Sequence, residues 1–549
     1  MSAARSMAGP PASTSVAARR WRRWLLLGGV AVCLGYFAAE LWVLGGRLGF
    51  PLDDSWIHLQ FARNLAAGRG LSYNPGELVI GSTAPLWTAI LALLFALPGD
   101  PVLWTQLLGT ALFVAGIGAT YRLARELDLA RGLAALAAGL TLGTAPLVWS
   151  ALSGMEVPLF VLLSLGGMIL HLRERRAAGS TSPLTISPAV FALACLARPE
   201  GFLLLLLALG DRCLLWARRP SAPLRLERPP FGAVAAGAAL AACVLLGPLL
   251  FYRLAGGSFL PTTFAAKGGE LRHWLPSLQY VYMVLGILLR GQPYMTLLGG
   301  AGVLALLERL GTLRDRGLLP ALWVIALPLA YSTLSPEGSK VIAGNFGRYY
   351  FPLFPPLVVL GTLGIERAAA AVGRYVECGR QRLPLRFVLL ALLLWPSAAG
   401  LLAGAATYER NLANVEGSDG RAARWLAARL PPAAVLAVND IGAFKYFLPN
   451  RIVDLAGIVN PELRREVSRA MAGGASWDQA MTAAIARRRP DYVAVFPSWV
   501  PGLARDPRFQ PVLALRIPDN VTMGSDLLVI YGTPWTLPAH RLRRLPGDG

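Results

Sequence analysis

Long apolar runs recur along most of the chain and constrain its fold more than any other feature. Runs of about 15–23 residues recur from Leu25 to Leu402, and about 20 apolar residues suffice for a helix to cross a bilayer. Inside lipid, the backbone must hydrogen-bond within its own segment, so these runs are predicted to be helices. Only 15% of the residues are charged, and the mean hydropathy is +0.51. A mainly α-helical, polytopic membrane protein is therefore predicted.

Arginine clusters between the apolar runs predict how the chain is oriented. The formal net charge is +21, but its distribution between apolar runs indicates membrane topology rather than nucleic-acid binding. Placing the clusters in the cytoplasm, with the basic N-terminus 1–23, gives about eleven spans. The first run is long and lacks a small-residue cleavage site, so it is interpreted as a retained helix. The predicted spans are 24–45, 101–121, 132–149, 157–171, 183–197, 200–216, 231–252, 293–308, 317–334, 350–371 and 386–404.

Two further apolar stretches, 83–97 and 276–290, do not fit this alternation. If either one alone crossed, the later arginine clusters would lie outside, so both are predicted to lie in the outer interface or to re-enter from it. The predicted membrane domain is 24–404, and its first external loop is 46–100. The expected location is the bacterial inner membrane, with the part of the chain from 405 on in the periplasm or outside the cell.

The segment 405–549 changes character and predicts an external α/β domain. Strands are expected at 434–438, 452–455, 492–496, 512–517 and 527–531, and helices at 417–430, 461–472 and 476–488. The five cysteines lie in predicted spans or cytoplasmic loops, so no disulfide framework is expected. The sequence has no P-loop and no GxGxxG motif after a strand, and therefore suggests no nucleotide cofactor.

The first external loop carries two adjacent carboxylates, Asp53 and Asp54, next to a membrane edge. Ionised groups avoid that zone unless a function requires them. Apolar residues at helical spacing follow the pair. Either aspartate could therefore simply cap a helix N-terminus. The other interpretation is a catalytic carboxylate, with His58 close by.

Several sequence motifs recur along the chain near the predicted external side. They are DDSWIHLQFARNLAAGRGLSYNPGE from Asp53, GSTAPLW from Gly81, SGME ending at Glu156, ARPEG around Arg198, GSFLPTTFAAK ending at Lys267, NFGRYYFP around Arg348, VNDIG around Asp440 and DLAG from Asp454. Together these motifs resemble the GT-C superfamily of membrane glycosyltransferases. The resemblance is greatest to a bacterial branch related to the mycobacterial arabinofuranosyltransferases, and protein mannosyltransferases are more distant. Thr262 stands where Asn is common in that branch.

The resemblance implies transfer of a sugar from a polyprenyl-phosphate carrier to an acceptor hydroxyl, with inversion. The acceptor would be an envelope glycan, a lipid or a protein, and membrane lipids surround the enzyme. A first-loop carboxylate would be the general base, and Asp53 is favoured over Asp54. This chemistry suits the sequence, because a hydroxyl needs a base during attack and a leaving phosphate needs nearby cations.

Four external cations are candidates to bind the donor phosphate: Arg348, Lys267, Arg198 and Lys340. Arg348 is favoured because a guanidinium can grip phosphate through two bonds. The alternative for Arg198 is an internal ion pair with Glu200. Further substrate-binding candidates are His58, Glu156, Thr262, Tyr349 and Asp440, although turn chemistry at a strand end also accounts for Asp440.

A divalent cation is one alternative that the residues leave open, held by Asp53, Asp54 and Glu156; no cofactor is otherwise expected. A transporter or flippase for a lipid-linked sugar is a second functional class, but it predicts ionisable residues at mid-membrane and repeated halves. An envelope scaffold is a third class, and it leaves the aspartate pair unexplained.

Overall fold

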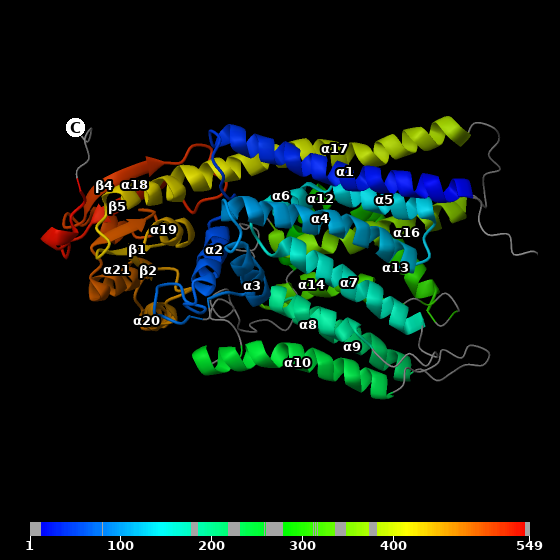
Figure 1. The fold of residues 1–549 in the computed structure, drawn as a ribbon, viewed down its shortest axis with the longest axis horizontal. Helices are drawn as coiled ribbons and strands as arrows, with labels where there is room; N and C mark the ends of the chain where they lie inside the picture. Colours follow the sequence, from blue (N-terminus) through cyan, green and yellow to red (C-terminus); the bar gives the residue numbers. More distant parts are fainter. Residues whose placement is uncertain are drawn as a thin grey trace, which may run out of the picture.

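The computed structural model is dominated by helices packed into a bundle, with a small sheet at one end (Figure 1). It describes residues 12–79, 81–176, 185–217, 231–256, 278–310, 317–334, 347–372 and 382–543, and the single residues 259, 312 and 315. Within these ranges, five helices are long and apolar enough to cross a membrane. The number rises to seven if two bent helix pairs each form one span. The protein is a multi-pass membrane protein.

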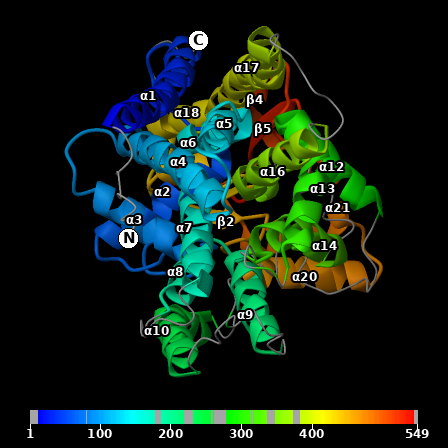
Figure 2. The same cartoon turned by 90° about the vertical axis from the view of Figure 1, so that its right-hand side faces the viewer.

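The helices of the bundle cover the first three quarters of the chain. Figure 2 shows them from a second direction, with α8, α9 and α10 extending away from the rest. Their bounds are α1 Ala12–Val43, α2 Asp53–Ala66, α3 Pro85–Leu94, α4 Pro101–Glu126, α5 Arg131–Leu142, α6 Ala145–Leu152, α7 Val157–Arg176, α8 Ser187–Ala197, α9 Gly201–Ala217, α10 Phe231–Gly256, α12 Leu278–Gly291, α13 Pro293–Glu308, α14 Leu319–Leu334, the 3₁₀ helix η1 Arg348–Leu353, α16 Phe354–Val372 and α17 Arg382–Val415.

Each predicted span falls on a helix, but several of these helices differ from a straight crossing. The predicted span 132–149 is two helices, α5 and α6, bent by 55°. Apolar stretch 276–290 is the helix α12, which meets α13 at 114°. Helices α8 and α14 are apolar but shorter than a full crossing. Hydropathy locates apolar segments, whereas tertiary packing decides where a helix bends.

The C-terminal α/β domain contains a five-stranded sheet of order β2-β1-β3-β5-β4. Strand β1 pairs in parallel with β2 and β3, and β5 pairs antiparallel with β3 and β4. All five predicted strands are present, and the predicted helices 461–472 and 476–488 are α20 and α21. The bounds are β1 Val435–Val438, α19 Gly442–Phe447, β2 Arg451–Asp454, α20 Pro461–Ala472, α21 Trp477–Arg488, β3 Tyr492–Val495, α22 Pro501–Arg505, β4 Gln510–Arg516, β5 Leu527–Gly532 and the 3₁₀ helix η3 Pro538–His540.

A continuous helical connection joins the bundle to this domain. Helix α17 runs through the predicted boundary at 404, and a π-helical turn, η2 (Glu416–Gly420), leads into α18 (Arg421–Arg429). Single π-helical turns are rare and occur frequently at functional sites.

Helix α2 lies between the sheet and the bundle, beside α19 (Figure 1). Its two faces bury different apolar sets: Trp56 and Leu59 belong to the core of the bundle, whereas Ile57 and Phe61 pack with strand residues of the sheet. The first loop is thus fixed between the two parts of the molecule. Any site on the first loop is therefore lined by both the helical bundle and the α/β domain.

Candidate active site

Asp53 and Asp54 occupy the first turn of α2, but neither is its N-cap. The N-cap is Leu52, which makes no side-chain cap. Negative charge in a first turn is favoured by the helix dipole, so part of the capping interpretation holds. The two carboxylates nevertheless turn to different partners, which lie 389 and 294 residues further along the chain.

The Asp53 carboxylate binds the N-terminus of α19 in the C-terminal domain. The backbone N–H of Gly442 donates to Asp53 Oδ2 at 2.6 Å, and that of Ala443 donates to Oδ1 at 2.7 Å. The approach requires glycine, because a Cβ at position 442 would lie 2.1 Å from the backbone oxygen of Asp53. Asp53 therefore caps a helix of another domain and joins the first loop to it.

The Asp54 carboxylate pairs with Arg348 at the start of η1. Arg348 is almost fully buried, and its Nη1 has no hydrogen-bond partner among the described residues. The guanidinium also lies over the ring of Tyr349, 5.6 Å from the ring centroid. A buried guanidinium with an unused N–H group is suited to receive an anionic ligand beside a carboxylate.

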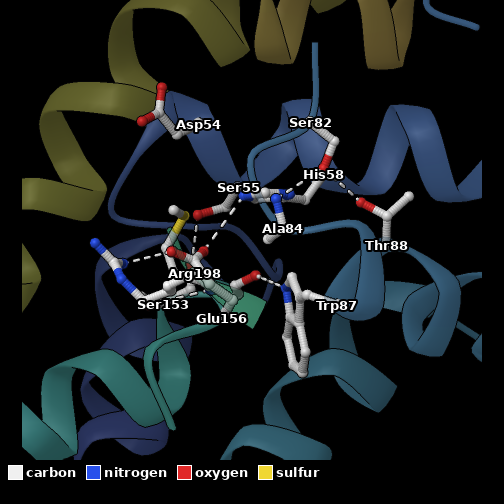
Figure 3. A network of polar contacts seen from close by, with 12 residues as sticks. Asp54, Ser55, His58, Ser82, Ala84, Trp87, Thr88, Ser153, Glu156 and Arg198 are labelled. Atoms are coloured by element: carbon white, nitrogen blue, oxygen red, sulfur yellow. Dashed lines mark hydrogen bonds and ion pairs between the residues drawn. The ribbon is translucent and has the colours of Figure 1, made fainter. Parts of the chain in front are cut away.

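A second ion-pair network lies below α2, centred on Arg198 in the turn between α8 and α9. Arg198 binds Glu156 and Glu200 through separate nitrogens, and all three side chains are buried. The hydroxyl of Tyr331 donates to Glu200 at 2.7 Å, and His58 Nε2 lies 3.4 Å from Glu156. The predicted internal pair Arg198–Glu200 is confirmed. In Figure 3, Asp54 points away from this network.

The turn that carries Glu156 is held directly by the first loop. The Ser55 hydroxyl donates to the Ser153 carbonyl, and the Trp87 indole N–H donates to the Gly154 carbonyl at 3.0 Å (Figure 3). Gly154 has φ +75°, and a Cβ there would lie 2.6 Å from the Phe50 ring. Only glycine fits this position. The SGME motif therefore fixes the position of Glu156 relative to the first loop.

The pKa of Glu156, in the network around Arg198, and the pKa of Asp53 shift in opposite directions. Burial alone would raise the pKa of Glu156, but Arg198 and His58 outweigh it and hold that pKa below its ordinary value. Burial would lower the pKa of Arg198, but Glu200 and Glu156 raise it above its ordinary value. Each of these two shifts favours the charged form of its group, Glu156 as a carboxylate and Arg198 as a guanidinium. Glu156 and Glu200 already bind the guanidinium of Arg198, which leaves Arg198 less able than Arg348 to bind a phosphate.

Asp53, in contrast, lies in an acidic cluster with Asp440 and Asp419. Burial and the charge of Asp440 raise the pKa of Asp53, although the N–H groups of α19 lower it. Burial and Asp54 raise the pKa of Asp440, and burial, Asp440 and Asp53 raise that of Asp419. The sequence analysis placed Asp440 among the substrate-binding candidates but missed Asp419. A π-helical turn has no sequence signature that would have revealed it.

The alternative metal site is not assembled in this geometry. Asp53 faces α19, Asp54 faces Arg348, and Glu156 faces Arg198. Across the described ranges, no three acidic, histidine or cysteine side chains converge as a metal would require. These residues therefore do not fit a shared divalent cation.

The site unites eight of the eleven candidate residues from the sequence. Asp53, Asp54 and His58 come from α2, and Tyr349 lies between Arg348 and Arg198, with its ring 5.1 Å from the Arg198 guanidinium. Asp440 joins from the sheet, and Glu156 from the turn before α7. The other three candidates, Thr262, Lys267 and Lys340, lie outside the described residues.

Comparisons with known proteins agree with this architecture. A family model described as a domain of unknown function (DUF8728) matches residues 406–537. No curated protein matches the chain. ArnT from Cupriavidus metallidurans in the apo state is similar in structure, with TM-score 0.56 and 15% identity over 92% of this chain and 97% of that chain. The same protein bound to undecaprenyl phosphate gives TM-score 0.56 at 16% identity, with the same coverage.

A third solved structure comes from an archaeon. The oligosaccharyltransferase of Archaeoglobus fulgidus in the apo form has TM-score 0.54 and 12% identity, over 86% of this chain and 69% of that chain. At these identities the likeness is one of fold. This chain shares its overall fold with ArnT and with the archaeal oligosaccharyltransferase.

Proposed function

We propose that this protein is an inverting glycosyltransferase that moves a sugar from a polyprenyl-phosphate carrier to a hydroxyl acceptor at the outer face of the membrane. The observation that carries the proposal is the position of Asp53, Asp54 and Arg348, where the helical bundle meets the α/β domain. A base and a phosphate-binding cation lie beside one another there. The fold likeness supports the same reaction type, because one similar structure is bound to undecaprenyl phosphate.

In this reaction Asp53 takes the proton of the acceptor hydroxyl as its oxygen attacks the anomeric carbon. The bond between that carbon and the phosphate oxygen breaks, and the electron pair leaves with the phosphate. The leaving group is already an anion that needs little protonation, so a cation is sufficient to stabilise it. The unused Nη1 of Arg348 supplies this charge, and Asp54 holds the guanidinium in place.

Asp53 is the better base of the two carboxylates. Asp54 is engaged by a guanidinium, which stabilises its anion and weakens it as a base. Asp53 has a raised pKa, and a base is most effective when its pKa lies close to the working pH. The acceptor is an envelope glycan, lipid or protein, and the expected location is the bacterial inner membrane with the α/β domain in the periplasm.

The test is a transfer assay with purified protein in lipid nanodiscs, using synthetic polyprenyl-phosphate sugars and candidate acceptors. Asp53→Asn should slow transfer by about 10²–10⁴-fold, and Asp54→Asn should weaken donor binding. Asp506→Asn, which changes a partly exposed carboxylate of the α/β domain that pairs with Arg508, should retain full activity. Equal activity in the wild type, Asp53→Asn and Asp54→Asn would refute the proposal, as would the absence of transfer from every carrier. Movement of an intact lipid-linked sugar across the bilayer of a proteoliposome would support the flippase alternative.

A further inference from the structure

A carboxylate lies in the last turn of the first membrane helix, where negative charge is unfavourable. Glu40 is fully buried and belongs to the candidate membrane span Arg22–Val43. Ionisable residues are rare in membrane spans and mark functional positions there. The C-terminal end of a helix also disfavours negative charge, because the negative pole of the helix dipole lies there. This end of α1 lies on the side of the bundle that faces the α/β domain (Figure 1).

Three groups from different parts of the fold donate hydrogen bonds to the Glu40 carboxylate. Gln106 Nε2, on α4, lies 3.0 Å from Oε1 and 2.8 Å from Oε2. The hydroxyl of Tyr408, on α17, donates to Oε2 at 2.7 Å. The backbone N–H of Gly49, in the first loop, donates to Oε1 at 3.0 Å. All three act as donors, which matches an ionised carboxylate because that group only accepts.

Glu40 and Gln106 together hold the backbone of Gly49, and we call this pair the Gly49 clamp. The Gly49 N–H donates to Glu40, and Gln106 Nε2 donates to the Gly49 carbonyl at 3.2 Å. Turning the Gln106 amide around would place its oxygen against three acceptors, so the amide is fixed in this orientation. On its other side Gly49 contacts η2, since a Cβ at this position would lie 2.7 Å from Glu416 Cγ.

The chain between the clamp and the proposed base is short and tightly packed. Asp53 follows Gly49 by four positions, and Pro51 between them has a fixed φ angle. Phe50 is fully buried, and its ring centroid lies 4.9 Å from that of Trp56 on α2. A shift of Gly49 would therefore be passed on to the first turn of α2.

We propose that Glu40 and Gln106 are positioning residues, which act through Gly49 to set where the Asp53 carboxylate lies relative to the acceptor. This inference rests on the proposed function, in which Asp53 is the general base. Tyr408 bonds to the same Glu40 carboxylate and lies on α17, the helix that leads into the α/β domain. The clamp thus joins the first loop to α1, α4 and α17 at once.

The kinetic test measures kcat and the donor KM separately in Glu40→Gln and Gln106→Met. The first change leaves a single acceptor oxygen at position 40, and the second removes the bonds donated by the amide while keeping the length of the side chain. Each should lower kcat by about 10- to 100-fold, because a misplacement of about 1 Å can cost 10²-fold. The donor KM should change less than about twofold, because Arg348 lies on η1 rather than on the first loop.

Thr105→Val is the matched control for these variants. Thr105 is buried one position before Gln106, and its hydroxyl donates to the Pro101 carbonyl within α4. The control should keep the kcat of the wild type. The inference would be overturned if Gln106→Met had the same kcat as Thr105→Val, or if its loss of activity lay in the donor KM alone.

Hydrogen–deuterium exchange tests the clamp without any activity. In Gln106→Met the segment 46–56 should exchange at least about tenfold faster than in the wild type, because its local opening becomes easier. Thr105→Val should exchange as the wild type does. Unchanged exchange in Gln106→Met would overturn the inference, even if Glu40→Gln fails to fold. If the wild type transfers no sugar, the proposed function fails, and exchange alone then decides whether the clamp holds the first loop.

Discussion

Asp53 and Gly442 are joined by a 2.6 Å hydrogen bond across a separation of 389 residues. The bond brings the first external loop to the N-terminus of α19, and the Ala443 N–H makes a second bond to the same carboxylate. The residue favoured as the general base is therefore also a point of attachment between the two parts of the molecule. Chemistry and domain docking are coupled at one side chain.

Gly442→Ala should disturb the site without touching any charged group. The added Cβ would lie 2.1 Å from the Asp53 backbone oxygen, so α2 and α19 must separate. We expect a lower Tm and at least a tenfold loss of transfer, measured by thermal unfolding and by the transfer assay. Gly473→Ala is the control, because its Cβ would meet nothing closer than 3.4 Å. Wild-type behaviour of Gly442→Ala would contradict the docking role.

Asp53→Asn should reduce kcat by about 10²–10⁴-fold, the range that general base catalysis contributes. The amide oxygen can still accept one hydrogen bond from α19, so the domains should remain docked. Equilibrium binding of the polyprenyl-phosphate donor should be nearly unchanged, and isothermal titration would measure it. A large loss of donor affinity with unaltered kcat would assign Asp53 to binding instead.

Arg348→Lys should raise the KM for the donor by about tenfold, since a hydrogen bond to a charged group contributes about 1.5–3 kcal/mol. Lysine keeps the charge but not the planar pair of donors that can bind Asp54 and a phosphate together. Steady-state kinetics over a range of donor concentrations would measure the change. Arg508→Lys, at an exposed position, should behave as the wild type. An unaltered donor KM in Arg348→Lys would count against the phosphate role.

Glu156→Gln should destabilise the protein by about 3–5 kcal/mol, because Arg198 would lose one of its two buried partners. Thermal or denaturant unfolding in detergent would measure this loss. The triple variant Glu156→Gln, Arg198→Met and Glu200→Gln should recover part of it, because no buried charge of the network is then left without its partner. A triple variant less stable than the sum of the single changes would argue against a paired network.

The thermal stability should fall as the pH rises from about 4, the ordinary carboxyl value. A carboxyl whose pKa is raised by folding adds stability below its unfolded pKa, and this contribution is lost as the pH rises through the folded value. Burial raises the pKa of Asp454 to about 6, although backbone N–H groups lower it; the pKa values of Asp53, Asp440 and Asp419 are also raised.

Melting curves at fixed ionic strength would test this pH dependence. Asp440→Asn should show a smaller decline of Tm between pH about 4 and about 8, because one of the titrating groups is removed. Asp506→Asn should decline as the wild type does. A Tm that rises over this range would contradict the raised pKa values.

The sequence by itself determined the elements of this protein. Apolar runs located the helices of the bundle, including α12, which meets α13 at a sharp bend. The alternation of short apolar segments with Gly and Pro located all five strands within about two residues. The sequence also indicated Asp53, Asp54 and Arg348 as a site. These features follow from local periodicity and side-chain chemistry, which a short window of sequence contains.

Only the tertiary structure decided which partner each charged group has. The sequence could not indicate that Asp53 binds α19 while its neighbour Asp54 binds Arg348, because adjacent residues on a helix point in different directions and their partners lie about 300–400 residues away. Asp419 gave no signal at all, since a π-helical turn depends on packing between α17 and α18. Long-range contacts of this kind are set by how the elements pack together, and that packing leaves no local pattern in the sequence.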